Sequence, residues 1–199
     1  MSAFDLTGKV AIVTGASRGL GQTFARALAR AGADLVITSR RLDLLKPFQA
    51  EVESFGRRAV ALALDVRRED SIHAMVSDAA RAYPRLDILV NNAGCNVRKR
   101  AIDVTWDDWN LILDTNLRGA FFGAQAVAKQ MIPHGRGRII NIGSLTSVMG
   151  SAGLGPYGAS RGGIRQLTMS LAHNSKPEMT DAADRCAGRR PVEDVRRVS

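Results

Sequence analysis

The fold of this chain can be inferred from the stretch Val10-Ala11-Ile12-Val13-Thr14-Gly15-Ala16-Ser17-Arg18-Gly19-Leu20-Gly21. Its first four residues form an apolar, mostly β-branched run, which predicts a buried strand. Its last residues begin a pattern of apolar side chains at spacings of three and four, which predicts an amphipathic helix as far as Ala31. The glycines between them allow a tight turn, and the start of a helix presents free N–H groups and a partial positive charge. The stretch therefore predicts a phosphate-binding turn between a strand and a helix.

The same alternation of strand and helix continues along the chain. Short apolar runs predict further strands at 35–37, 59–64, 86–90 and 138–142. Apolar stripes predict helices at 45–55, 72–79, 106–113, 117–131 and 157–171. Parallel strands joined by right-handed crossovers have helices on both faces of their sheet. This order therefore predicts an α/β fold with a doubly wound parallel sheet of about five strands, the Rossmann fold.

Composition and charge narrow the class of protein. The 199 residues are 45% hydrophobic, which fits one globular domain with a sizeable core. The net charge is +9, but the basic residues are scattered and have no aromatic residues among them, so we expect no nucleic-acid partner. No apolar run is long enough to cross a membrane and the N-terminus lacks a signal-peptide pattern, so we expect a soluble, cytoplasmic protein. Cys95 and Cys186 have neither CxxC spacing nor metal-ligand neighbours, so we expect no metal.

The chain changes character after Ala172. Residues 173–199 contain no Leu, Ile, Phe, Trp or Tyr, and their remaining apolar residues are mostly Ala and Val among charges. Such a segment buries little apolar surface. We therefore predict one folded domain over residues 1–172, followed by an atypical, disordered tail over residues 173–199.

Five motifs resemble, in their order along the chain, those of the short-chain dehydrogenase/reductase family. They are Thr-Gly-x-x-x-Gly-x-Gly at 14–21, Asp65-Val66, Asn91-Asn92-Ala93-Gly94, Asn116, and Ser144 followed by Tyr157 in Tyr-Gly-Ala-Ser-Arg. The resemblance extends from about Lys9 to Ala172. It implies an oxidoreductase that transfers a hydride between NADP(H) and a carbonyl or secondary alcohol. Family members continue with a sixth and a seventh strand, which we expect to be missing here, as in a C-terminally truncated member.

The resemblance also implies where a dinucleotide would bind. The cofactor-binding residues it implies are Gly15, Ser17, Arg18, Gly19, Leu20, Gly21, Ser39, Arg40, Asp65, Val66, Asn92, Ala93, Gly94, Tyr157 and Arg161. An acidic residue after the second strand is typical of NAD-binding proteins, whereas an arginine accommodates the 2′-phosphate of NADP. This chain has Ser39-Arg40-Arg41 there, and Arg18 in the glycine-rich turn. We therefore predict NADP, with NAD as the alternative if Arg40 and Arg41 are only cations at the start of a helix.

The catalytic set implied by the resemblance is Asn116, Ser144, Tyr157 and position 161. Tyr157 would be the general acid/base, Ser144 would hydrogen-bond the reacting oxygen, and Asn116 would hold a water molecule. A free tyrosine has a pKa of about 10, so a phenolate near neutral pH needs a neighbouring cation. The family has Lys one helical turn after the tyrosine, and this chain has Arg161. Arginine keeps the positive charge and can bind ribose hydroxyls, but it does not release its proton for a relay.

The loop after Gly94 bears on the substrate. Its sequence Cys-Asn-Val-Arg-Lys-Arg is similar to that of sugar-acid dehydrogenases of the family, such as gluconate 5-dehydrogenase and 2-deoxygluconate 3-dehydrogenase. Arg98 would bind a substrate carboxylate beside Ser144 and Tyr157, or else is a solvated loop cation. One alternative is an enzyme similar to 3-oxoacyl-[acyl-carrier-protein] reductase. Another is a nucleotide-binding protein with impaired catalysis, because of Arg161 and the truncation. The family also implies a homo-oligomer.

Overall fold

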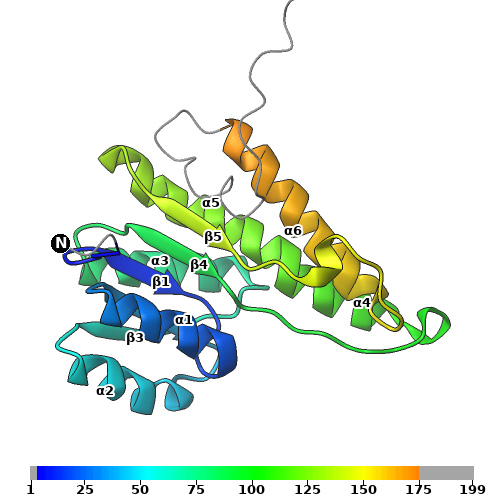
Figure 1. The fold of residues 1–199 in the computed structure, drawn as a ribbon, viewed down its shortest axis with the longest axis horizontal. Helices are drawn as coiled ribbons and strands as arrows, with labels where there is room; N and C mark the ends of the chain where they lie inside the picture. Colours follow the sequence, from blue (N-terminus) through cyan, green and yellow to red (C-terminus); the bar gives the residue numbers. More distant parts are fainter. Residues whose placement is uncertain (1–3, 175–199) are drawn as a thin grey trace, which may run out of the picture.

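A five-stranded parallel sheet forms the centre of the molecule (Figure 1). The computed structural model describes residues 4–174. The strands are β1 (Val10–Val13), β2 (Asp34–Ser39), β3 (Ala59–Ala63), β4 (Ile88–Asn91) and β5 (Arg138–Asn141). The helices are α1 (Gly19–Arg30), α2 (Lys46–Ser54), α3 (Glu69–Ala82), α4 (Trp106–Leu113), α5 (Gly119–Met131) and α6 (Gly155–Asn174). The sheet order β3-β2-β1-β4-β5 confirms the predicted doubly wound fold.

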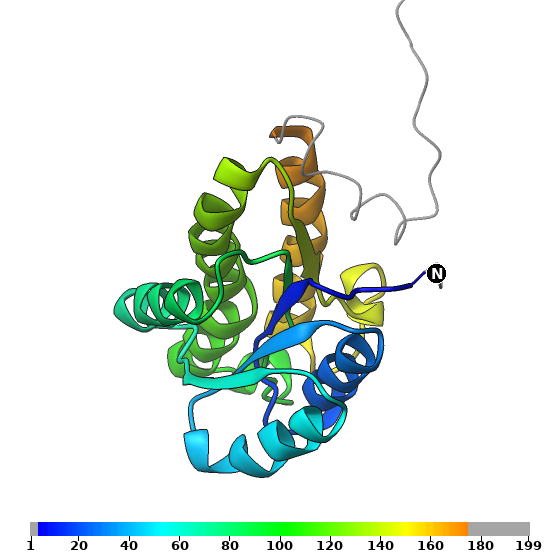
Figure 2. The ribbon, with the colours of Figure 1, turned by 90° about the vertical axis from the view of Figure 1, so that its left-hand side faces the viewer.

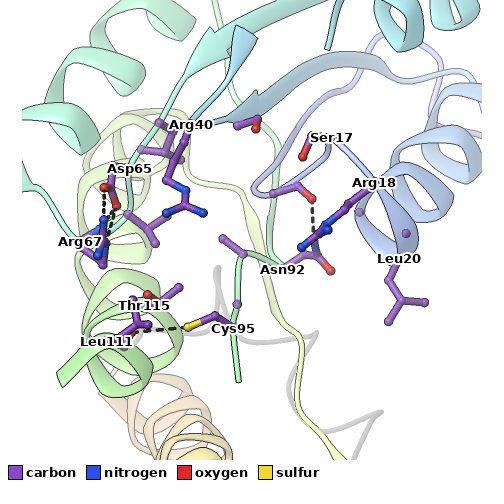
Figure 3. Close-up of a pocket in the computed structure, with 18 residues that line it drawn as sticks. Ser17, Arg18, Leu20, Arg40, Asp65, Arg67, Asn92, Cys95, Leu111 and Thr115 are labelled. Carbon is purple, nitrogen blue, oxygen red and sulfur yellow. Dashed lines mark hydrogen bonds and ion pairs between the residues drawn. The ribbon is translucent and has the colours of Figure 1, made fainter. Parts of the chain in front are cut away.

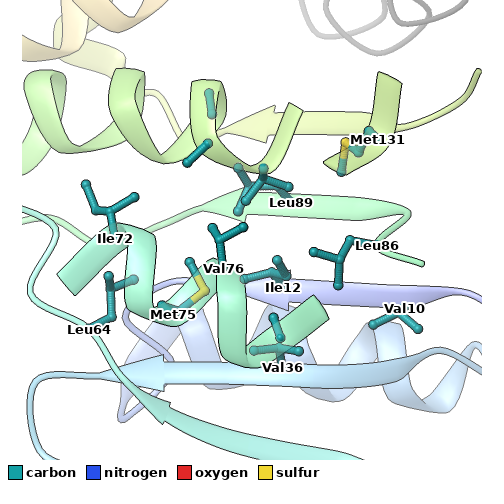
Figure 4. Packing of buried hydrophobic residues seen from close by; sticks show 14 of the residues in the cluster. Val10, Ile12, Val36, Leu64, Ile72, Met75, Val76, Leu86, Leu89 and Met131 are labelled. Atoms are coloured by element: carbon teal, nitrogen blue, oxygen red, sulfur yellow. The ribbon is translucent and has the colours of Figure 1, made fainter. Parts of the chain in front are cut away.

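Helices cover both faces of the sheet, because successive side chains of a strand point to opposite faces. Ile12 and Leu89 lie on the face covered by α3 and α5, where they pack in one core with Val76 and Met131 (Figure 4). The side chains next to them in sequence pack on the other face against α1 and α2. Figure 2 shows α1, in blue, and α3, in blue-green, on opposite sides of the sheet.

The carboxyl end of β1 lies where the strand order changes direction. Ile12 in β1 is paired with Val36 of β2 on one side and with Leu89 of β4 on the other. The chain leaves β1 for α1 on one face and leaves β4 for α5 on the opposite face. The loops after β1 and β4 therefore separate, and in open α/β sheets this is the place where ligands bind.

The structure has one helical feature that the apolar periodicity did not predict. The helices predicted at 106–113 and 117–131 are joined without a break by a π-helical turn over Asp114–Arg118. A π turn adds one residue to the helix, and such turns are frequent at functional sites. Asn116 lies in this turn and is buried. The other predicted ends agree with the observed ones to within three residues.

Two predictions concern parts of the chain beyond α6. Residues 175–199 of the predicted tail lie outside the described residues, so the tail and the expected lack of further strands stay predictions.

The longest helix among residues 4–174 is α6, with 20 residues. None of the helices in that part of the chain combines the length and the apolar character that a membrane span requires.

Candidate functional site

A cleft of about 540 Å³ opens along the carboxyl ends of the central strands (Figure 3). Its lining comes from the turns after β1, β2, β3 and β4, and from the helices beside them. The lining residues are Gly15, Ser17, Arg18, Gly19, Leu20, Gly21, Ser39, Arg40, Leu64, Asp65, Val66, Arg67, Asn92, Ala93, Gly94, Cys95, Leu111 and Thr115. Every cofactor residue predicted in the turns after the strands is among them.

The glycine-rich turn needs glycine for two different physical reasons. Gly15 and Gly19 have φ values of +69° and +58°, a backbone region that side chains with a Cβ rarely adopt. Gly21 is required by space, since a Cβ there would lie 2.3 Å from the Gly15 carbonyl oxygen. The backbone of α1 thus begins directly against the turn, and its first residues line the cleft, where the free N–H groups of a helix start stabilise an anion. This cradle, which a Cβ would fill, fits a pyrophosphate.

Hydrogen bonds fasten the turn to the end of β4. The Thr14 hydroxyl accepts from the backbone N–H groups of Asn92, at 3.0 Å, and Ala93, at 2.9 Å. The Asn92 amide in turn donates to the carbonyl oxygens of Thr14, at 2.9 Å, and Gly15, at 3.2 Å. These hydrogen bonds hold the carboxyl ends of β1 and β4 together at the base of the cleft.

Arg18, Arg40 and Arg67 bring positive charge to the lining of the cleft. Among residues 4–174, neither Arg18 nor Arg40 has a carboxylate partner. Arg67 is paired instead, through Nη2, with Asp65 Oδ2 at 2.8 Å. Arg67, and to a smaller extent Arg40, hold the pKa of the Asp65 carboxyl below its ordinary value. An anionic group such as a phosphate would find two uncommitted guanidinium groups here.

Ser144 and Tyr157 lie on segments that pack together, since the short helix Leu145–Ser147 after Ser144 contacts α6. The Ser144 hydroxyl oxygen accepts from the backbone N–H of Thr146, at 3.2 Å, and from its hydroxyl, at 3.0 Å. Both lone pairs are then in use, so the Ser144 proton remains to be donated to another oxygen. Tyr157 is half-buried in the first turn of α6.

Arg161 lies one helical turn after Tyr157 and is 6% exposed. Its guanidinium carbon is 5.2 Å from the centre of the Tyr157 ring, and its Nη1 donates to the Ile142 carbonyl at 2.7 Å. Its Nε is buried with no hydrogen-bond partner among the described residues. A Cβ at Gly94 would lie 2.4 Å from Arg161 Nη2, so this guanidinium reaches the wall of the cleft. The predicted cation beside the tyrosine is thus present, and it adjoins the cleft without lining it.

Asn116 connects three segments around these residues. Its amide oxygen accepts from the Cys95 N–H at 2.8 Å, and its nitrogen donates to the Cys95 carbonyl at 2.9 Å and to Ser160 Oγ at 3.0 Å. Ser160 Oγ donates to the Tyr157 carbonyl at 2.7 Å. The side chain therefore ties the π turn to the loop after β4 and to the start of α6. Its role in holding a water molecule stays a prediction.

The loop after β4 lies against the segment that leads into α6. The Lys99 N–H donates to the Gly153 carbonyl at 3.2 Å, and a Cβ at Gly153 would lie 3.2 Å from Arg98 Cγ. Lys99 pairs with Asp108 and Arg100 pairs with Asp103. Arg98 is exposed and has no carboxylate partner within residues 4–174. Its guanidinium is therefore not paired with a carboxylate there, and its side chain lies beside Gly153, before α6 begins.

Five lining residues were missed by the sequence analysis: Leu64, Arg67, Cys95, Leu111 and Thr115. Leu64, Arg67 and Cys95 directly adjoin predicted site residues, so their position after a strand was a usable signal. Leu111 and Thr115 are brought in by α4 and the π turn; the apolar stripe predicts α4 itself but not that it faces the cleft. Within the part of the chain that the structure describes, no group of three His, Cys, Asp or Glu side chains could hold a metal ion.

A doubly wound parallel sheet, a cleft at its switch point and a glycine-rich turn at a helix start together define a dinucleotide-binding class of protein. Within this class, a family model described as short chain dehydrogenase matches residues 9–182. The chain belongs to the short chain dehydrogenase family of oxidoreductases.

Several proteins similar to this chain are named as sugar-acid dehydrogenases. Gluconate 5-dehydrogenase of Gluconobacter oxydans is 40% identical over a match that covers 85% of this chain and 66% of that protein. 2-Dehydro-3-deoxy-D-gluconate 5-dehydrogenase of Escherichia coli is 39% identical, with 87% and 68% covered. The crystal structure of a Burkholderia cenocepacia gluconate 5-dehydrogenase in complex with NADP and tartrate is 36% identical, with 90% and 70% covered and a TM-score of 0.85. This chain thus spans about two thirds of the length of these proteins.

Proposed function

We propose that this protein is an NADP(H)-preferring oxidoreductase that acts on a carbonyl or secondary alcohol of a sugar acid. The main supporting observation is that a dinucleotide cleft with two uncommitted arginines adjoins a serine, tyrosine and arginine set. Gly94 connects the two, because it lines the cleft and lies against Arg161. Gluconate and NADP in the names and titles of relatives agree with this assignment.

Each part of the cleft suits one part of the dinucleotide. The turn Gly15–Gly21 and the start of α1 would hold the pyrophosphate. Arg40 and Arg18 would hold a 2′-phosphate, and Asp65 and Val66 would contact the adenine. Asn92 to Gly94 and the Arg161 Nε, which lacks a partner within the described residues, would face the ribose on the nicotinamide side. When bound, the nicotinamide supplies or accepts the hydride.

The chain itself supplies the proton and the positioning. The Ser144 proton, free because its oxygen already accepts twice, would hold the reacting oxygen. The Tyr157 hydroxyl would give a proton to that oxygen in reduction and take it back in oxidation. Arg161 places a permanent positive charge over the Tyr157 ring, with its guanidinium carbon 5.2 Å from the ring centre. Arg161 cannot pass a proton onward, so the proton must leave the tyrosine by another route.

Arg98 supports a carboxylated substrate. Its two cationic neighbours in the loop are paired with Asp108 and Asp103, whereas Arg98 is not paired within residues 4–174. A carboxylate held by Arg98 would be oriented by two parallel N–H···O bonds. Arg98→Ala should raise the KM for a sugar acid about tenfold or more and leave the KM for a neutral ketone within about twofold. Equal effects on both substrates would remove this assignment.

The proposed function is tested by titrating the protein with NADPH and NADH and then following hydride transfer over a panel of carbonyls and alcohols. We expect tighter binding of NADPH and turnover with sugar acids. The Arg40→Ala variant should lose NADPH affinity by about tenfold while NADH affinity changes little. Tighter binding of NADH in the unchanged protein would contradict the NADP preference.

One observation favours a second substrate class. An apolar groove of about 500 Å³ is lined by Val104, Trp106, Trp109 and Pro156, next to Tyr157 in sequence. An acyl chain would suit such a groove, as in a 3-oxoacyl-[acyl-carrier-protein] reductase. The same panel separates the two classes if it includes a 3-oxoacyl thioester. Turnover of the thioester, with none of a sugar acid, would favour the second class.

The tethered guanidinium of Arg161 favours a third possibility, a nucleotide-binding protein with impaired catalysis. Because Nη1 is bound to the Ile142 carbonyl, Arg161 is less free than a lysine would be. Dinucleotide binding without hydride transfer would identify this case, and recovery of turnover in Arg161→Lys would assign the impairment to this residue.

We also propose a homo-oligomer located in the cytoplasm. Large apolar side chains stand exposed on α4 and α5, with Trp106 83% and Phe122 41% exposed. Such groups on neighbouring helices favour association with a second copy. Light scattering after size exclusion measures the oligomeric state, and cell fractionation measures the location.

A further inference from the structure

We propose that Arg67 determines specificity for the 2′-phosphate indirectly, by holding the Asp65 carboxylate so that Arg40 stays available to the phosphate. The inference rests on the proposed NADP(H) preference and goes beyond it, because Arg67 itself need not touch the cofactor. It makes Arg67 a positioning residue at the adenosine end of the cleft.

The Asp65 carboxylate is held at both oxygens by one residue. Arg67 Nη2 donates to Oδ2 at 2.8 Å, and Nε donates to Oδ1 at 3.1 Å. The Arg67 backbone N–H adds a third bond to Oδ1 at 3.1 Å. Such a bidentate ion pair is stronger and better oriented than an ion pair with a single hydrogen bond. The Asp65 side chain is 20% exposed and that of Arg67 37%, so the pair lies partly sheltered from water.

Arg40 is the other cation beside Asp65. Arg40 follows Ser39 at the end of β2, and Asp65 follows Leu64 after β3. The Leu64 N–H donates to the Ser39 carbonyl at 3.0 Å, which brings the two chain segments side by side. Both side chains line the cleft, and Figure 3 shows Arg40 next to the Asp65–Arg67 pair. The lowering of the Asp65 pKa by Arg40 agrees with this closeness.

Loss of Arg67 would change the charge pattern at this end of the cleft. The Asp65 carboxylate would lose its two side-chain hydrogen bonds from Arg67 and would be left beside Arg40, which also lines the cleft. A carboxylate paired with Arg40 competes with a phosphate for the same guanidinium and repels the phosphate directly. An unphosphorylated ribose is spared both effects. The preference should therefore shift away from the 2′-phosphorylated ligand.

The test measures binding by isothermal titration calorimetry, so it does not depend on turnover. The probes are 2′,5′-ADP and 5′-AMP, which differ in the 2′-phosphate. Arg67→Ala should weaken 2′,5′-ADP binding by about tenfold and 5′-AMP binding by less than about twofold. The double variant Arg67→Ala/Asp65→Asn should recover 2′,5′-ADP binding to within about threefold of the unchanged protein, since the competing charge is gone.

Arg68→Ala is the matched control. Arg68 pairs with Asp70 at the same spacing, but both side chains are exposed and neither lines the cleft. This variant should bind both probes like the unchanged protein. Thermal melting of each variant checks the fold, and Arg67→Gln replaces Arg67→Ala if the latter melts below the assay temperature.

Two results would overturn the inference. If 2′,5′-ADP binding stays weak in the double variant, Arg67 contacts the phosphate directly. If Arg67→Ala weakens both probes equally, the pair has no role in specificity. Arg40→Ala separates these failures from failure of the proposed function: a selective loss of 2′,5′-ADP there keeps the NADP preference, and no selective loss removes it.

Discussion

Replacement of Gly21 by alanine is expected to damage both the glycine-rich turn and dinucleotide binding. The new Cβ would lie 2.3 Å from the Gly15 carbonyl oxygen and 2.7 Å from Asn92 Nδ2. Contacts to carbon are normally about 3.5 Å, so one backbone must move by roughly 1 Å. The Gly15 side has little room, because a Cβ position there is already 3.0 Å from Ala93 Cα. The clash therefore pushes two main-chain segments apart.

Two effects of opposite sign set the change in stability. Alanine is about 1 kcal/mol more favourable than glycine inside a helix. Overpacking typically costs about 1 to 3 kcal/mol, and displacement of main chain places Gly21→Ala near the upper end. We expect a net loss of about 2 kcal/mol in the free energy of unfolding. For a chain of this size that loss lowers the melting temperature by roughly 4 to 8 °C.

The same displacement should weaken NADPH binding. Misplacing binding groups by about 1 Å can reduce their effect by up to about a hundredfold, so we expect at least a tenfold loss in affinity by fluorescence titration. Gly150→Ala is the control, because a Cβ there meets nothing within 4 Å and its φ is not in the left-handed region. It should melt and bind like the unchanged protein. If Gly21→Ala melts no lower and binds NADPH as tightly, the steric account of Gly21 is wrong.

Three further predictions concern stability. Burial raises the pKa of Tyr83 to about 12 from an ordinary 10.0, so the folded state keeps a proton that the unfolded state releases. Urea unfolding should show a loss of about 2 to 3 kcal/mol as the pH rises from about 10 to about 12, and Tyr83→Phe should lack this part of the loss. The Lys99 ammonium group, with Thr105, lowers the pKa of Asp108 from 3.8 to about 2. The ionised Asp108 carboxylate therefore stabilises the folded state above pH 3.8, and this stabilisation disappears as the pH falls towards 2. Asp108→Asn should melt below the unchanged protein at neutral pH, and a difference that persists undiminished at pH 2 would contradict this assignment. Leu89 is fully buried between the sheet and helices α3 and α5, so Leu89→Ala should lower the free energy of unfolding by about 2 to 5 kcal/mol in chemical denaturation. Leu20 is exposed, so Leu20→Ala should lower it by less than about 1 kcal/mol.

Local patterns in the sequence were enough to predict the sheet and the dinucleotide cleft. The run Val10–Val13 and the glycine-rich turn after it depend on side-chain period and on backbone freedom, both properties of adjacent residues. Because parallel strands end at one edge of a sheet, the residues after each strand could be expected to meet there. Arg40 was predicted from its place after the second strand and Asp65 from the family resemblance, and both line the cleft.

Helix ends and the path between helices were less predictable. The predicted apolar stripes end at Leu113 and begin again at Leu117, so the sequence indicated two separate helices, whereas the π turn at Asp114–Arg118 joins them. Within this turn, the Asn116 amide is hydrogen-bonded to Cys95 and Ser160 in other parts of the chain. Such a turn is stabilised by partners distant in sequence, and no local pattern contains them.

From the amino-acid sequence alone follow the α/β order of strands and helices, the phosphate-binding turn and the arginine one helical turn after Tyr157. The tertiary structure decided what that arginine contacts. Arg161 is bound to the Ile142 carbonyl, stacked beside the Tyr157 ring and placed against Gly94. These partners come from the end of β5, from α6 and from the loop after β4. Helical periodicity places side chains relative to their own helix, whereas contacts between segments are set by how the sheet and helices pack.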